Sequence, residues 1–250
     1  MLLLEDKVAL VYGAGGAIGG AVARAFAREG ATVYVAGRTG AKVARLAREI
    51  RAEGGDAHAA EVDALDEAGV DAFVDGVAEQ TGRIDVSFNL MGVGDVQQPL
   101  TEIAVDDFLA PIVNVTRGHF LTTRAAARHM SARGGGVVLA FGGSGTQTLP
   151  GLGGFKIALD ALEGLRRQWA CELGASGIRL VTLKTGGVPE SMPAFEGRDE
   201  IEAELTRSTL LGRTATLSDV GDVAAFVASD RARTMTSATV NISCGALVDI

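Results

Sequence analysis

Residues 8–19 read VALVYGAGGAIG, a short apolar run that leads into four glycines. A continuous apolar run without alternation is typical of a strand that is buried on both faces of a parallel sheet. Glycines directly after such a strand permit a tight turn and a close approach of phosphate, and the start of the next helix favours negative charge. The stretch therefore predicts a strand–turn–helix unit for a dinucleotide, held by Gly13, Gly15, Gly16, Ile18 and Gly19. The alternative is a strand-to-helix turn that binds nothing.

The same alternation of strand and helix continues along the chain. The predicted strands cover 8–11, 31–36, 57–62, 84–90, 136–141, 179–183 and 239–243. The predicted helices cover 16–28, 41–53, 67–80, 106–132, 152–173 and 218–228, the last one capped by Ser218. This order predicts one α/β domain over residues 1–250, a Rossmann-type doubly wound parallel sheet of about seven strands with helices on both faces. Residues 185–210 are expected to form a substrate loop over the crevice at the carboxyl ends of the strands.

Composition excludes several other classes of protein. The 250 residues are 47% hydrophobic and carry a formal net charge of −8, without a basic stripe that would favour nucleic acid. Two cysteines, Cys171 and Cys244, provide neither a disulfide framework nor metal-ligand spacing. The first residues lack the pattern of a signal peptide, and no apolar run reaches the roughly 18 residues of a membrane helix. We expect a cytoplasmic protein with no metal, membrane or nucleic-acid partner.

The glycine spacing resembles that of the short-chain dehydrogenases/reductases, although Tyr12 and Ala17 stand where that family usually has Thr and Gly. The resemblance continues in order over almost the whole chain. It implies a nicotinamide cofactor held by the glycine turn and by later positions that match the family: Asp63, Asn89, Gly92, Lys156, Gly186 and Val188. It also implies an oxidoreductase that acts on a small-molecule substrate and assembles as a homodimer or homotetramer, through the helix around Asn114 and the helix that carries Trp169.

The end of the second strand favours NADP(H) over NAD(H). An acidic residue about 20 positions past the glycines would bind the ribose hydroxyls and repel a 2′-phosphate. Gly37 takes that place here, and the adjacent Arg38 is able to pair with a phosphate. The alternative for Arg38 is a solvated loop arginine.

The family's proton-transfer residues are missing from the expected places. The resemblance assigns catalytic roles to Asn114 and to Lys156, and the family has a tyrosine four residues before that lysine. Here Leu152 takes the tyrosine position and Gly142 the serine position, and the segment up to Lys156 is about three residues short. Ser144 and His119 are possible substitutes, with a loop serine and a packed helix histidine as their simpler interpretations.

A placed general acid contributes about 10²–10⁴-fold to such a reaction, so its loss makes ordinary alcohol and ketone chemistry slow. Leu90, Met91, Leu149, Leu152 and Phe155 would line an apolar crevice. We therefore expect a reductase of a small or medium apolar carbonyl or enone substrate that works by an atypical proton route. The alternative is a non-redox descendant of the family: a pseudoenzyme, a binding or scaffold protein, or a cyclase or isomerase that reuses the pocket.

Overall fold

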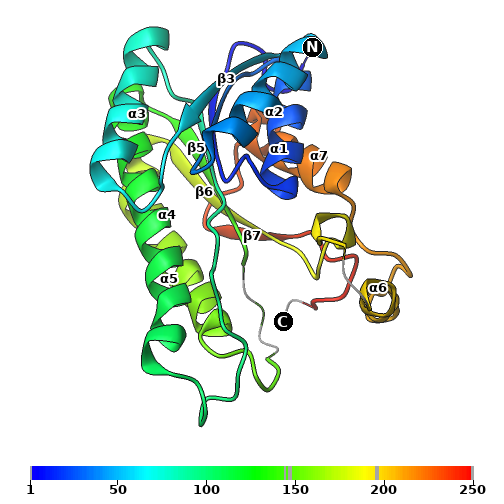
Figure 1. The fold of residues 1–250 in the computed structure, drawn as a ribbon. Helices are drawn as coiled ribbons and strands as arrows, with labels where there is room; N and C mark the ends of the chain where they lie inside the picture. Colours follow the sequence, from blue (N-terminus) through cyan, green and yellow to red (C-terminus); the bar gives the residue numbers. More distant parts are fainter. Residues whose placement is uncertain (1, 144, 146–147, 195–196, 249–250) are drawn as a thin grey trace.

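The computed structural model describes residues 2–143, 145, 148–194 and 197–248, and its described strands form one parallel sheet (Figure 1). The seven strands lie in the order β3-β2-β1-β4-β5-β6-β7. They are β1 (Val8–Tyr12), β2 (Thr32–Gly37), β3 (Asp56–Glu61), β4 (Val86–Asn89), β5 (Gly136–Phe141), β6 (Ile178–Lys184) and β7 (Ala238–Asn241). The predicted Rossmann-type sheet is thereby confirmed.

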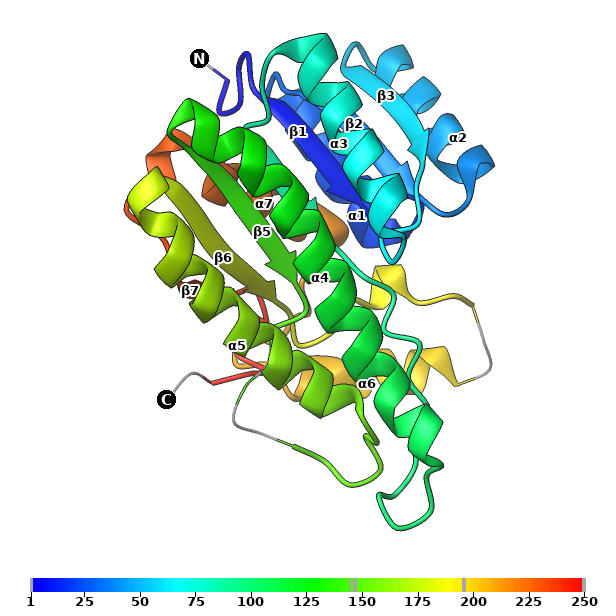
Figure 2. The same ribbon diagram turned by 90° about the vertical axis from the view of Figure 1, so that its left-hand side faces the viewer.

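Helices cover both faces of this sheet, and each layer has its own buried core. One core joins the sheet to α1 (Ala17–Arg28), α2 (Gly40–Ala52) and α7 (Leu217–Ala228). The opposite face packs against α3 (Glu67–Thr81), α4 (Val105–Arg133) and α5 (Phe155–Leu173), of which α4 and α5 lie side by side (Figure 2). Strands such as β1 are buried along their whole length, which explains their unbroken apolar sequence.

The order of the strands places the crevice. β1 pairs with β2 on one side, where Tyr12 is opposite Ala36, and with β4 on the other, where Val11 is opposite Phe88. The order of the strands reverses between β1 and β4, because the chain builds β1 to β3 on one side and β4 to β7 on the other. Ligands of such sheets bind at this point, outside the carboxyl ends of the strands. The turn at Gly13 therefore opens onto the expected position.

Most element boundaries differ from the sequence prediction by a few residues, and two of the differences have a clear local cause. The residue that caps α7 is Thr216 and not Ser218: the Thr216 hydroxyl accepts from the Asp219 N–H at 3.0 Å, and the Asp219 carboxylate accepts from the Thr216 N–H at 2.9 Å. α5 begins at Phe155 and not at Leu152, because Gly151 and Gly153 adopt positive φ angles of 80° and 55° that interrupt a helix.

The expected loop over residues 185–210 contains helices of its own. A 3₁₀ turn covers Pro189–Ser191, and α6 covers Arg198–Arg207. α6 stands apart from the sheet beside the carboxyl ends of the strands (Figure 1). In the described part of the chain, no helix has both the length and the apolar character that crossing a membrane requires.

Candidate functional site

The turn after β1 is closely packed on one side and open on the other. Gly13 has a φ of 71°, and a Cβ atom there would lie 2.6 Å from the Leu90 carbonyl oxygen. A Cβ atom on Gly19 would lie 2.3 Å from the Gly13 carbonyl oxygen. Residue 19 must therefore be glycine for the helix to pack this closely against the turn. At Gly16, the N-cap of α1, a Cβ atom would have just one neighbour within 4 Å among the described residues, that same Gly13 oxygen at 3.5 Å. The first turn of α1 is thus open to an anion.

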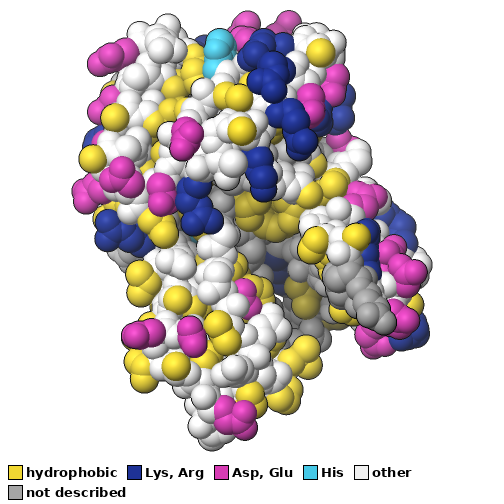
Figure 3. All heavy atoms as spheres, in the orientation of Figure 1, with side chains coloured by type: hydrophobic (Ala, Val, Ile, Leu, Met, Phe, Trp, Pro, Cys, Tyr) yellow, Lys and Arg dark blue, Asp and Glu magenta, His cyan; other side chains and the backbone are white. Residues whose placement is uncertain are grey.

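A cleft of about 470 Å³ runs from this turn along the ends of β1, β2 and β4. It brings together six residues that the sequence predicted as site residues: Gly13, Gly16, Arg38, Asp63, Gly92 and Asn114. On this side the surface is hollowed between the body of the sheet and the segment that carries α6, and hydrophobic side chains border the hollow (Figure 3). The separate sequence positions therefore converge on one cleft.

Two cations lie near the glycine turn, Arg38 in the lining of the cleft and Lys42 outside it. Arg38 is exposed after β2, and its Nη2 lies 3.9 Å from the place of a Cβ on Gly92, across the cleft. Lys42, in the first turn of α2, packs its Cβ 3.3 Å from the place of a Cβ on Gly15. Among the described residues, neither cation forms an ion pair with a carboxylate. Sequence reasoning missed Lys42, whose only signal was its place one turn beyond Arg38.

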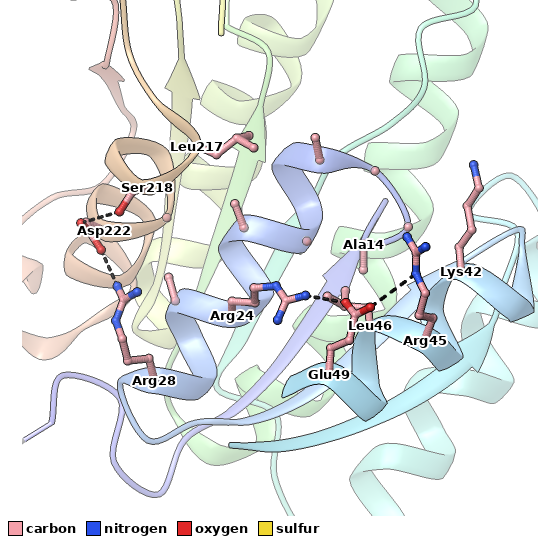
Figure 4. A pocket seen from close by; sticks show the side chains of 17 residues that line it. Ala14, Arg24, Arg28, Lys42, Arg45, Leu46, Glu49, Leu217, Ser218 and Asp222 are labelled. Carbon is pink, nitrogen blue, oxygen red and sulfur yellow. Dashed lines mark hydrogen bonds and ion pairs between the residues drawn. The ribbon is translucent and has the colours of Figure 1, made fainter. Parts of the chain in front are cut away.

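A second groove, of about 580 Å³, lies on the outer side of α1 between α2 and α7 (Figure 4). Gly15 lies at one end of it. Carboxylates neutralise two of its cations: Arg24 pairs with Glu49, and Arg28 pairs with Asp222. Lys42 also lines this groove, and within the described ranges it has no such partner (Figure 4).

The remaining predicted cofactor residues surround the cleft without lining it. Asn89 is fully buried, donates to the Thr123 hydroxyl at 3.3 Å and accepts from Ser87 at 2.8 Å, so it ties β4 to α4. Ile18 packs against the core beneath the first turn of α1. Gly186, which follows β6, approaches Ser243, since a Cβ there would lie 3.2 Å from the Ser243 Cβ. Val188, two residues after Gly186, is buried.

The predicted catalytic residues lie on two neighbouring helices. Asn114, on α4, lines the cleft and donates to the Val93 carbonyl at 3.5 Å. Lys156, on α5, binds both carboxylate oxygens of Asp160 at 2.6 Å. The α5 residue that meets Gly142, the predicted serine position, is Leu159, whose Cδ2 lies 3.4 Å from the place of a Cβ on Gly142.

The structure treats the two residues predicted as possible substitute acids differently. His119 is 3% exposed on α4, and burial lowers its pKa to about 3, so the ring is neutral at ordinary pH. It borders a small space with Thr123, Arg166 and Trp169, away from the cleft residues. Ser144 lies outside the described residues.

Sequence reasoning also missed a buried ion pair beneath the segment that follows β5. Glu163 and Arg166 of α5 are each 7% exposed, and Arg166 donates to one Glu163 oxygen from Nε at 3.0 Å and from Nη2 at 2.7 Å. A Cβ on Gly143 would lie 2.8 Å from the other Glu163 oxygen. The sequence did contain a signal for this pair: Glu163 and Arg166 are charged residues on the otherwise apolar face of α5.

Comparison with known proteins gives long matches. The family described as enoyl-(acyl carrier protein) reductase matches residues 13–246. An A-factor type gamma-butyrolactone 1'-reductase (1S-forming) of Streptomyces virginiae is 32% identical over 250 residues, which cover 97% of this chain and 96% of that protein.

Solved structures show the same extent of similarity. A 7α-hydroxysteroid dehydrogenase complexed with NADH and 7-oxo glycochenodeoxycholic acid matches with a TM-score of 0.88 at 25% identity, over 98% of this chain and 95% of that one. A short-chain type dehydrogenase/reductase of Mycobacterium ulcerans matches with a TM-score of 0.87 at 26% identity, over 98% and 91% of the two chains.

Proposed function

Because this chain belongs to the short-chain dehydrogenase/reductase family of oxidoreductases, we propose that it is an NADP(H)-dependent reductase of a small or medium apolar substrate, with an atypical route for the proton. The observation that carries the proposal is the open glycine turn of α1, with Arg38 lining the cleft on one side of it and Lys42 packed beside Gly15 on the other. The relatives named above include a reductase of a butyrolactone and a dehydrogenase crystallised with a steroid-type ligand, which agrees with an apolar substrate.

The chain's own residues fit a dinucleotide. Gly13 and Gly19 let the turn pack closely, and Gly16 leaves the amides at the start of α1 uncovered for a pyrophosphate. Asp63 borders the same cleft at the adenosine end, with its side chain accepting from the Leu65 N–H at 3.0 Å. When bound, a reduced nicotinamide would supply hydride.

The preference for NADP(H) rests on charge. Gly37 provides no carboxylate for the ribose hydroxyls, whereas Arg38 and Lys42 provide two cations for a 2′-phosphate. We expect Arg38→Asp to weaken NADPH binding about 10- to 100-fold, since a charge-assisted hydrogen bond contributes roughly 1.5–3 kcal/mol. NADH affinity should not fall. The exposed Arg48 of α2 gives a matched control, because Arg48→Asp makes the same change in net charge. Unchanged NADPH affinity in Arg38→Asp would remove the basis of this assignment.

We further propose that Phe155 and Leu159 occupy the family's tyrosine and lysine positions, in place of Leu152 and Lys156. Phe155 and Leu159 keep the spacing of four residues that separates the family's tyrosine from its lysine. Moving both positions three residues later also restores the expected length of the segment that leads to them. The contact between Leu159 and Gly142 supports this register, as does the start of α5 at Phe155. In this register Lys156 stabilises the first turns of α5 through its pair with Asp160, one turn further along the helix. In either register the usual tyrosine is absent.

A non-redox descendant of the family remains the second candidate, because Gly142, Phe155 and Leu159 carry no group that exchanges protons. Stopped-flow loss of the NADPH signal against a panel of ketones, enones and imines separates the two. Turnover with any of these classes supports the reductase. Tight NADPH binding without turnover favours a binding protein, cyclase or isomerase.

A further inference from the structure

A buried carboxylate with one oxygen that lacks a hydrogen-bond partner among the described residues lies next to Gly143, just after β5. Glu163 Oε2 accepts from Arg166 twice and from the Thr239 hydroxyl at 3.1 Å. Glu163 Oε1 is buried, and no hydrogen-bond partner for it exists in the described part of the chain. A buried acceptor without a partner is rare in native proteins and calls for an explanation.

The oxygen without a hydrogen-bond partner in the described ranges lies on the Gly143 side of the cluster. It lies 2.8 Å from the place of a Cβ on Gly143, the residue next to Gly142 at the end of β5. Arg166 extends the other way, where its Nη1 donates to the Ser237 hydroxyl at 3.3 Å. The ion pair therefore presents its negative end to Gly143, at the carboxyl end of β5, where ligands of such sheets bind. The Lys184 Cβ lies 3.1 Å from the place of a Cβ on Gly143. The Lys184 residue also takes part in a further interaction.

Among the described residues, those proposed for the family's serine, tyrosine and lysine positions offer no proton donor. Gly142, Phe155 and Leu159 carry only hydrogen or hydrocarbon, and His119 is a neutral ring in the helix layer. Hydride transfer to a ketone leaves an alkoxide that needs a proton from a placed acid. Hydride transfer to a protonated imine does not: the new C–H bond forms at the imine carbon, the C=N π pair becomes the nitrogen lone pair, and a neutral amine results.

We propose that the substrate is a protonated imine on an apolar frame, and that Glu163 selects it through the negative charge beneath Gly143. This inference rests on the proposed reductase function, with a reduced nicotinamide dinucleotide as the hydride source. It accounts together for the missing acid, which an iminium does not need, and for the buried carboxylate, which attracts a cation. Glu163 is a specificity-determining residue in this account.

The first test is equilibrium binding, which does not depend on turnover. Calorimetric titration of the NADP⁺-loaded protein compares 1,2,3,4-tetrahydroisoquinoline, protonated at neutral pH, with its uncharged oxygen isostere isochroman. We expect the ammonium to bind at least about tenfold more tightly, and Glu163→Gln to remove most of that difference. Glu172→Gln, on the exposed part of the same helix, is the matched control and should behave as wild type. Thermal unfolding checks that Glu163→Gln is folded, and the wild-type comparison stands without the variant.

The second test is turnover of 3,4-dihydroisoquinoline against 2-tetralone, a ketone on a similar bicyclic frame. Reduction of the imine with little reduction of the ketone supports the proposal. Faster ketone reduction, or equal binding of the ammonium and isochroman by the wild type, overturns it and leaves the reductase function intact. Tight NADPH binding with no turnover of ketones, enones or imines overturns both.

Discussion

His119 shows how a single buried residue determines behaviour in acid. The unfolded chain protonates this histidine below its ordinary pKa of 6.5, whereas the folded chain does so only near 3. Between these values the unfolded state binds more protons, so the free energy of unfolding falls as the pH falls. Burial on α4 keeps water away from the charged ring, and this desolvation is what lowers the pKa of His119.

We therefore predict that His119→Leu reduces the acid sensitivity of this protein. At pH 5 the wild type should have lost up to about 2 kcal/mol of unfolding free energy through His119 alone, at 1.36 kcal/mol for each unit of pKa difference. Urea unfolding at pH 7.5 and pH 5 measures the loss in both proteins. Equal losses in wild type and variant would show that His119 titrates normally in the folded state.

At the scale of an element, the start of α7 shows how capping locates a helix. Thr216 and Asp219 exchange two hydrogen bonds between side chain and backbone, and Ser218 lies inside the first turn. We predict that Thr216→Ala lowers the unfolding free energy by about 1 kcal/mol, because an N–H of the first turn loses its acceptor. Ser218→Ala is the control and should change it by less than about 0.5 kcal/mol. Equal effects in a denaturant titration would contradict the capping box.

The register of α5 is a second property of an element, and it allows a gain-of-function prediction. If Phe155 and Leu159 hold the family positions, then Phe155→Tyr and Leu159→Lys together should restore a proton donor and raise ketone reduction by about 10²–10⁴-fold. Gly142 is left unchanged because its φ of 112° disfavours a side chain. The control is Leu152→Tyr, which keeps Lys156. Steady-state kinetics with one ketone compares the two. A larger gain in the control would return the catalytic role to Lys156.

At the scale of the whole molecule, the outer face of α4 and α5 carries apolar side chains. Val113 is 52% exposed and Ile157 is 45% exposed, and Phe120 stacks on Trp169 with ring centroids 5.6 Å apart. A homo-oligomer through these helices stays a prediction. We expect a dimer or tetramer in analytical ultracentrifugation and a shift toward monomer for Val113→Arg, because a charge at a buried contact is not solvated. A wild-type monomer at micromolar concentration would contradict it.

Much of the fold followed from local sequence. The alternation of apolar runs with helical periodicity predicted a parallel α/β sheet, because each element must bury the face that its own residues define. The glycines of residues 13–19 indicated the phosphate turn for a similar reason, since close backbone approach requires them locally. The prediction that no tyrosine fills the family position also came from the sequence, because Tyr12 and Tyr34 are the only two tyrosines in the chain.

Tertiary structure alone decided which side chains meet at the crevice. The phase of α5 against β5 brings Leu159 to Gly142, and it brings Glu163 to Thr239, 76 positions away in the sequence. Lys42 reaches Gly15 only because α2 packs beside the turn. Such contacts depend on how whole helices settle on the sheet, and the packing of many distant residues sets that phase. Local periodicity states which face of a helix is buried, but not which atoms it will touch.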